Sequence, residues 1–243
     1  MVTADHQWCF ERARAVLAND NRAGLTIIDR YAGEISQGLV DADWAVGTIP
    51  GTDIAVAPVM HHLNPYTGQG LGGWISVAGG IVTNAALFCE SCFTIAREQW
   101  AENRPLAMRV FGVALHLVQD LTVPHHARCQ VWHHHAEYEL WLHREIDMTP
   151  ELPARNGSYH GGWPPARWVY ANARSAYGYF RYCDGLEPDP GHPPTWDFRR
   201  DDFVLVRNAL VPLAIKSSAG FTDYWAHWLL SPNKAEAGGS IFL

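Results

Sequence analysis

The sequence predicts an all-α protein, folded as a single-domain helical bundle with long loops. Apolar residues recur at helical spacing through most of the chain, whereas the alternation typical of strands is nearly absent. The length of 243 residues and the hydrophobic fraction of 48% suit one globular core. We therefore expect helices that each bury one face against a shared core.

The first half of the chain contains three segments with helical periodicity. They cover residues 6–22, 24–40 and 74–101. Between the second and the third, residues 41–72 are rich in glycine and proline, which predicts an irregular region. The pair Gly79-Gly80 falls inside the third segment, and we expect close packing or a local bend of the helix there.

The second half predicts four more helices, over residues 106–121, 133–147, 166–182 and 201–230. Pro124 supports a break after the first of them, because proline cannot continue a helix interior without losing a hydrogen bond. Proline-rich loops are expected over 149–165 and 184–199. We expect the last helix to be interrupted or bent near Pro212 and Gly220.

The charge disfavours a nucleic-acid partner, and the hydropathy pattern contains no transmembrane segment. A net charge of −7 and a pI of about 6.0 disfavour a stable nucleic-acid partner, since binding a phosphate backbone needs a basic face. No apolar run reaches the ~18 residues of a transmembrane segment. The N-terminus does not resemble a signal peptide, so the sequence leaves the compartment open. The oligomeric state is likewise not predicted.

The segment from His116 to Glu139 has the spacing of a metal site. His116 and Asp120 are four residues apart and share one helix face. After the turn expected at Pro124, His126 can point back towards the same space. His135 and Glu139 form a second pair at this spacing, and zinc prefers such nitrogen and oxygen ligands.

Periodicity alone does not choose every ligand in this segment. His125 competes with His126 for the position after the turn. Two further pairs have the same helical spacing, namely His133 with Glu137 and Glu139 with His143. These alternatives remain open from spacing alone.

The same segment resembles the bacterial zinc-dependent phospholipase C family, which is related to the S1/P1 nucleases. The resemblance lies in A-L-H-x-x-x-D-x-x-x-P-x-H, ending at His126, and in H-x-x-Y-E, ending at Glu139. Other stretches agree: His6 opens the first helix, Asp43 precedes an aromatic residue, and His61 begins H-H-L-N-P, with Asn64 in place of the family's aspartate.

The resemblance implies a fold of the phospholipase C/P1 nuclease type that holds three zinc ions. One zinc would be held by Asp43, His61, His116 and Asp120. Asp120 would bridge to a second zinc, which His6 joins, and the third would be held by His126, His135 and Glu139. His62 is a possible substitute for His61, Asp43 is also a candidate general base, and Trp44 is a candidate for the substrate pocket.

The implied function is hydrolysis of a phosphodiester bond in a phospholipid or a similar phosphate ester. An S1/P1-type nuclease or 3′-nucleotidase is the alternative enzyme, and a non-catalytic metal-binding helical scaffold is the alternative outside enzymes. The family is typically secreted, and its terminal tryptophan, whose amine completes the zinc site of the first histidine, has no counterpart here. Either the true start lies upstream, or another terminal amine substitutes, or the zinc beside His6 is weak or lost.

Overall fold

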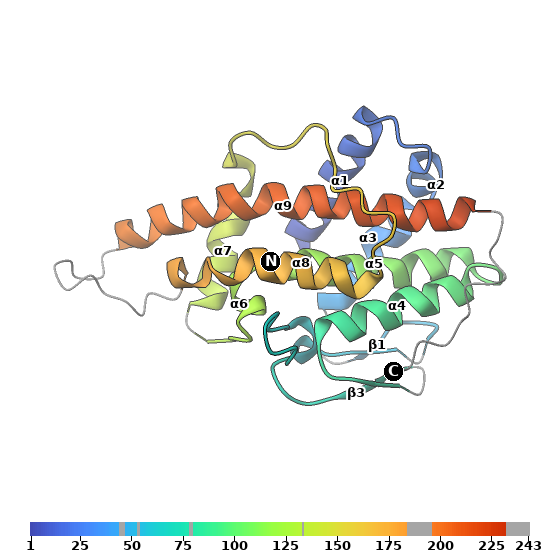
Figure 1. Cartoon of the computed structure of the whole chain (residues 1–243), viewed down its shortest axis with the longest axis horizontal. Coiled ribbons are helices and arrows are strands. Elements are labelled where there is room, and N and C mark those ends of the chain that lie inside the picture. Colours follow the sequence, from blue (N-terminus) through green and yellow to red (C-terminus); the bar gives the residue numbers. More distant parts are fainter. Residues whose placement is uncertain (44–46, 53, 78–79, 133, 184–195, 232–243) are drawn as a thin grey trace.

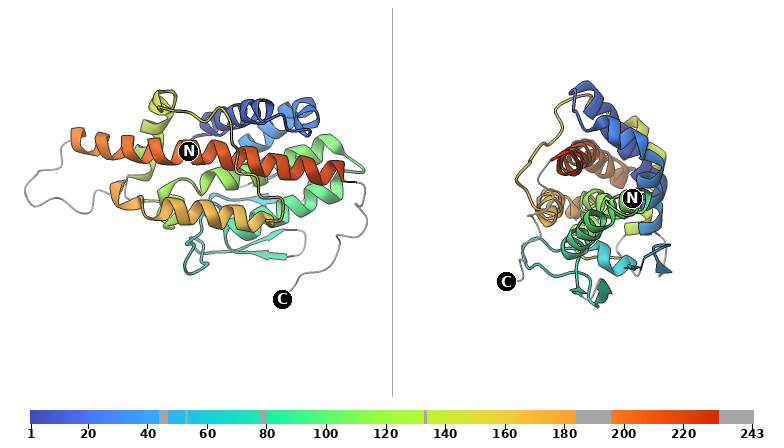
Figure 2. Two further views of the ribbon diagram at one scale, coloured as in Figure 1. Left: turned by 45° about the horizontal axis from the view of Figure 1, so that its top comes forward. Right: turned by 90° about the vertical axis from the view of Figure 1, so that its right-hand side faces the viewer.

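The computed structural model describes residues 1–243 except 44–46, 53, 78–79, 133, 184–195 and 232–243. Helices dominate these residues, which confirms the predicted all-α class. Four long helices run side by side along the molecule (Figures 1 and 2): α4 (Ala85–Gln99), α5 (Arg104–Asp120), α8 (Pro165–Tyr177) and α9 (Trp196–Leu230). Helix α5 is buried throughout from Val110 to Asp120, so its C-terminal half forms the centre of the core.

The N-terminal helices cover this bundle on one side. Helix α1 (Thr3–Asn19) packs on α9, and α3 (Ala32–Asp43) packs on α5. The helix predicted over 24–40 is in fact two helices, since α2 (Leu25–Arg30) ends before α3 begins. Apolar spacing continues across the junction at Tyr31, and periodicity therefore did not reveal the break.

Helices α3 and α5 approach each other closely through two glycines. A β-carbon on Gly38 would lie 1.9 Å from the carbonyl oxygen of Arg109, and one on Gly112 would lie 2.3 Å from that of Ile35. Only glycine permits backbones this close. Beside this contact, the carbonyl oxygen of Leu39 lies 3.1 Å from Nδ1 of His116, so the close approach also brings α3 beside the site residues of α5.

The prediction of a helix over 74–101 is wrong at its start. Strands β3 (Ile75–Val77) and β4 (Gly80–Val82) form an antiparallel hairpin, and α4 begins only at Ala85. β-Branched residues beside a glycine pair favour a hairpin over a helix. The side chain of Asn84 accepts a hydrogen bond from the Leu87 N–H at 3.0 Å, which caps the helix there.

A second small hairpin and a short helix lie in the region predicted to be irregular. Strand β1 (Gly47–Thr48) pairs with β2 (Ala55–Val56), and the 3₁₀-helix η1 (Pro58–His61) follows. Helix α5 ends at Asp120, before Pro124, as predicted. Pro124 occupies the first turn of a short helix, α6 (Pro124–Ala127), where its missing N–H costs nothing. The chain then continues through α7 (His135–Glu145), η2 (Ile146–Met148), α8 and η3 (Phe180–Tyr182).

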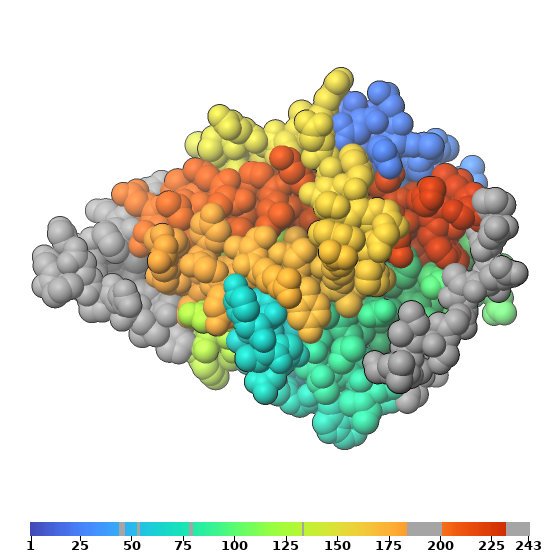
Figure 3. Space-filling view, viewed as in Figure 1, coloured from blue at the N-terminus to red at the C-terminus, as the bar shows by residue number. Residues whose placement is uncertain are grey.

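Helix α9 is continuous, contrary to the predicted interruption near Pro212 and Gly220. Gly220 serves packing instead, because a β-carbon there would lie 1.7 Å from the carbonyl oxygen of Ser158. The segment 149–165 crosses the surface over α9 at this place (Figure 3). Most of the predicted loop 184–199 lies outside the described residues. None of the described helices has the length and apolar composition that crossing a membrane requires.

Candidate metal centre

The structure brings the eight predicted ligands into three adjoining groups, although they come from six elements. We call them the α1 group (His6, His116, Asp120), the α3 group (Asp43, His61, His116) and the α7 group (His126, His135, Glu139). Within each group, the candidate ligand atoms all lie within 4.8 Å of one another. The groups lie around the C-terminal end of α5, where α1, α3, η1, α6 and α7 meet.

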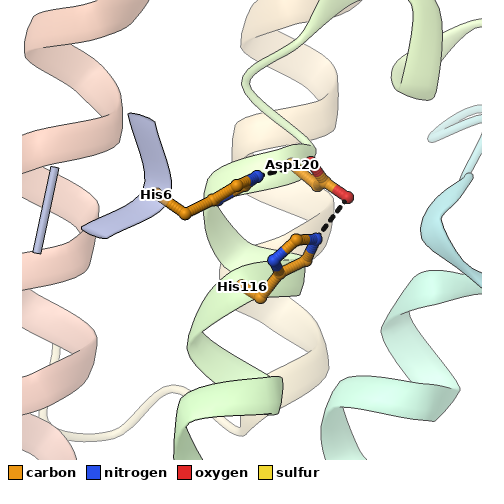
Figure 4. A group of neighbouring side chains, drawn as sticks. All are labelled: His6, His116 and Asp120. Atoms are coloured by element: carbon orange, nitrogen blue, oxygen red, sulfur yellow. Dashed lines mark hydrogen bonds and ion pairs between the residues drawn. The ribbon is translucent and has the colours of Figure 1, made fainter. Parts of the chain in front are cut away.

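Asp120 lies at the centre of these groups, with its two oxygens facing different histidines (Figure 4). Its Oδ1 lies 3.3 Å from Nε2 of His6. Its Oδ2 lies 2.8 Å from Nδ1 of His61 and 3.0 Å from Nε2 of His116. One carboxylate therefore contacts both the α1 group and the α3 group.

The rings of His6 and His116 lie face to face, with centroids 3.9 Å apart and planes 23° from parallel. An imidazole binds a metal through a nitrogen lone pair, which lies in the plane of its ring. Two nearly parallel rings therefore direct their lone pairs to two separate positions rather than to one. Their spacing is close to the ~3.5–4 Å between the ions of two-metal sites.

Three histidines have their orientation fixed by hydrogen bonds through Nδ1. His6 Nδ1 lies 2.7 Å from Oε1 of Gln119, His116 Nδ1 lies 3.1 Å from the carbonyl oxygen of Leu39, and His126 Nδ1 lies 3.0 Å from that of His61. An Nδ1–H donor facing each oxygen leaves the lone pair on Nε2, which is the tautomer a metal ligand needs.

The sequence did not reveal these orienting contacts. Gln119 is fully buried, and its Nε2 donates to Oγ of Ser218 on α9 at 3.0 Å. A glutamine between His116 and Asp120 in an otherwise apolar stretch was a signal for such a role. A backbone oxygen such as that of Leu39 gives no signal in a sequence.

Buried atoms without hydrogen-bond partners test whether the groups suit a metal. Among the described residues, these include Nε2 of His6, Nε2 of His61, Oδ1 of Asp120 and Nε2 of His126. A buried polar atom left unsatisfied costs about 1–3 kcal/mol. Imidazole nitrogens and carboxylate oxygens are the ligands that zinc takes in proteins, so the residues present fit zinc.

Glu139 joins the α7 group to the N-terminal end of α1. Its Oε1 lies 2.6 Å from the α-amino nitrogen of Met1 and 2.9 Å from Nε2 of His135. The Met1 nitrogen also lies 3.8 Å from Oδ1 of Asp120. A buried nitrogen is thus present between the α1 group and the α7 group.

The carboxylates are held in the charged form that metal ligands require. Burial opposes this charge, but His126 and His116 outweigh it and hold the pKa of Asp120 well below its usual range. The pKa of Glu139 is likewise well below its usual range, since the Met1 amine, His126 and His135 outweigh burial. Burial lowers the pKa of His61 and of His135, which favours their neutral, metal-binding forms.

The two pairs of neighbouring histidines have different surroundings. His61 lies in the α3 group, whereas His62 lies against His126. His126 lies in the α7 group, whereas the ring of His125 stacks against that of His135, with centroids 4.8 Å apart.

The described residues of the alternative i, i+4 pairs contact side chains outside those pairs. Two further residues named in the sequence analysis lie outside the described part of the chain. His143 contacts Asp5 at 2.8 Å. Glu137 pairs with His134. His133 and Trp44 lie outside the described residues, so the predicted substrate contact of Trp44 stays a prediction.

Comparisons with known proteins identify a family that matches the sequence and solved structures that have a similar fold. The family described as zinc-dependent phospholipase C matches residues 5–182. No curated protein matches the chain. The structure is similar to the alpha toxin from Clostridium absonum, with a TM-score of 0.67, 15% identity and coverage of 96% of this chain and 65% of the toxin.

A second solved structure gives the same result. The Clostridium perfringens alpha-toxin from avian strain SWCP has a TM-score of 0.67 and 16% identity, with coverage of 91% of this chain and 62% of the toxin. The chain therefore spans less than two thirds of the length of either toxin. At these identities, the likeness shows a shared fold.

Proposed function

The chain belongs to the zinc-dependent phospholipase C family, and we propose that it hydrolyses the phosphodiester bond of a phospholipid or a similar phosphate ester. The family comprises hydrolases that act on phosphoester bonds. The observation that carries the proposal is the convergence of eight nitrogen and oxygen donors into three adjoining groups. Such a cluster of histidines and carboxylates around one buried aspartate has the composition of a hydrolytic zinc centre.

We assign three zinc positions to these donors. Asp43, His61, His116 and Asp120 would hold the first. Asp120 would also serve the second, together with His6. The face-to-face rings of His6 and His116 support two separate positions bridged by Asp120. His126, His135 and Glu139 would hold the third.

When bound, zinc supplies Lewis-acid polarisation of a phosphate oxygen and lowers the pKa of coordinated water. The protein contributes fixed donor positions, because the Nδ1 hydrogen bonds of His6, His116 and His126 hold each ring in place. It also excludes water from most of the centre, since the side chains of His6, His116 and Asp120 are at most 1% exposed.

Asp43 is the most solvent-accessible of the eight donors. Its side chain is 24% exposed, and its Oδ2 accepts a hydrogen bond from Oγ1 of Thr3 at 2.6 Å. Burial opposes the charge of Asp43, but His116 and His6 outweigh it and lower the pKa. An ionised carboxylate that water can reach can accept a hydrogen bond from the attacking water and orient it, and its lowered pKa makes it a weak base.

The proposal is tested by offering zinc-loaded protein two substrates in parallel. Dihexanoyl phosphatidylcholine reports phospholipase C activity through release of a diacylglycerol, and 3′-AMP reports 3′-nucleotidase activity through release of phosphate. We expect diacylglycerol release that a zinc chelator abolishes. Cleavage of 3′-AMP alone would favour the nuclease alternative, and cleavage of neither would favour the non-catalytic scaffold.

A further inference from the structure

His62 is a buried histidine beside the α7 group to which the zinc assignment gives no role. His62 is 2% exposed. Its ring lies against the ring of His126, with centroids 4.6 Å apart and planes 15° from parallel, and edge-on to His135 at 6.3 Å. Its Nδ1 is buried and makes no hydrogen bond within the part of the chain that the structure describes.

Backbone hydrogen bonds hold the segment that carries this ring. The carbonyl oxygen of His62 accepts a hydrogen bond from the Ala85 N–H at 3.1 Å, which ties it to the start of α4. The Leu63 N–H donates to the carbonyl oxygen of His126 at 3.1 Å, and the ring of His126 bonds back to His61. The backbone on both sides of His62 is therefore held in place, and its ring lies against His126.

The ring geometry argues against His62 as a ligand of the same ion as His126. Each imidazole directs its lone pair within its own ring plane. Rings with centroids 4.6 Å apart and nearly parallel planes direct their lone pairs along two separate planes. In agreement, the donor atoms that converge in the α7 group come from His126, His135 and Glu139.

The chemistry of His62 suits contact with a bound group. Buried polar atoms in native proteins are almost always hydrogen-bonded, so an unpaired one needs an explanation. A neutral imidazole offers one N–H donor and one acceptor nitrogen.

Building on the proposed function, we propose that His62 is a substrate-binding residue that donates a hydrogen bond to a phosphate oxygen of the ester held at the α7 group. The ring of His62 lies beside the rings of both His126 and His135, so a phosphate held through these two residues would lie near it. A hydrogen bond to an anionic oxygen is stronger than one between neutral groups, so one donor here has a measurable effect on binding.

The test measures binding of inorganic phosphate to zinc-loaded protein by calorimetry, with zinc per chain determined on the same samples. His62→Phe keeps a flat ring of similar size against His126 but removes both nitrogens. His62→Gln keeps a polar N–H. We expect unchanged zinc in both variants, phosphate affinity about tenfold weaker in His62→Phe, and partial recovery in His62→Gln.

Three results would overturn this assignment. They are equal phosphate affinity in His62→Phe and wild type, loss of zinc from His62→Phe, which would make His62 a ligand, and absence of phosphate binding by zinc-loaded wild type. Because the assay requires no turnover, its outcome is separate from that of the proposed function. A protein that binds phosphate through His62 but hydrolyses no ester would refute the activity alone.

Discussion

Asp120 Oδ1 lies 3.3 Å from Nε2 of His6, across the contact between α5 and α1. The other oxygen of Asp120 faces His61 and His116. This one carboxylate therefore joins ligands from three separate parts of the chain. The predictions below concern the residues that hold this arrangement in place.

Gln119 orients His6, and we expect its amide oxygen to be needed for tight zinc binding at the second position. Gln119→Leu removes the acceptor for His6 Nδ1 and should weaken the affinity for the second zinc about 10–100-fold. Loss of a side chain that hydrogen-bonds a metal ligand typically has an effect of this size. Gln119→Glu keeps an acceptor and should bind zinc more tightly than the leucine variant. Competition with a chelator measures the affinities, and equal affinity in wild type and Gln119→Leu would contradict the role.

Gly38 permits the close approach of α3 to α5, and we expect Gly38→Ala to destabilise the protein by about 1–3 kcal/mol or more. Its β-carbon would meet the carbonyl oxygen of Arg109, so α3 must move. Gly33→Ala is the matched control on the same helix, because no atom lies within 4 Å of the added carbon. That change should be neutral or stabilising by up to about 1 kcal/mol. Urea unfolding of both variants is the measurement, and equal stability would argue against the contact.

Asp20 anchors the segment 149–165, and its contribution to stability should depend on pH. Its Oδ2 accepts hydrogen bonds from Tyr159 Oη at 2.6 Å and the Gly157 N–H at 3.1 Å. The Tyr159 hydrogen bond is the main cause of the lowered pKa of Asp20. A lowered carboxyl pKa contributes stability above the unfolded value of about 3.9, and this is lost as pH falls through the folded pKa.

Asp20→Asn should therefore be less stable than wild type at pH 7, with a smaller difference at pH 3. Urea unfolding at the two pH values measures this, and Tyr159→Phe should reproduce part of the effect at pH 7. A difference between wild type and Asp20→Asn that is the same at both pH values would show that the charge of Asp20 is not involved.

The local part of the candidate site could be predicted from spacing, but the rest could not. His116, Asp120, His135 and Glu139 lie at i, i+4 positions on helices, and helical geometry alone makes such pairs neighbours. His6, Asp43 and His61 are far away in the sequence, and only the resemblance to a family brought them into the site. The separate environments of His61 and His62 depend on ring orientation, which spacing does not contain.

The fold shows the same division between local and non-local information. Long periodic segments such as α5 and α8 were predicted within a few residues. The hairpin β3–β4 was predicted as helix because its apolar residues continue into the spacing of α4. An interruption of α9 near Gly220 was one of the predicted outcomes, but the helix is continuous there and Gly220 accommodates Ser158 from a distant segment, which no local pattern indicates.

The most direct test of the account is zinc per chain, by plasma mass spectrometry, in wild type and in Asp120→Ala, together with hydrolysis of the phospholipid. Asp201→Ala, which removes an exposed carboxylate of α9, is the control. We predict about three zinc ions in wild type and in the control. Asp120→Ala should keep only the zinc of the α7 group and lose hydrolysis. Unchanged zinc and full activity in Asp120→Ala, or no zinc in wild type from zinc-supplemented medium, would contradict the account.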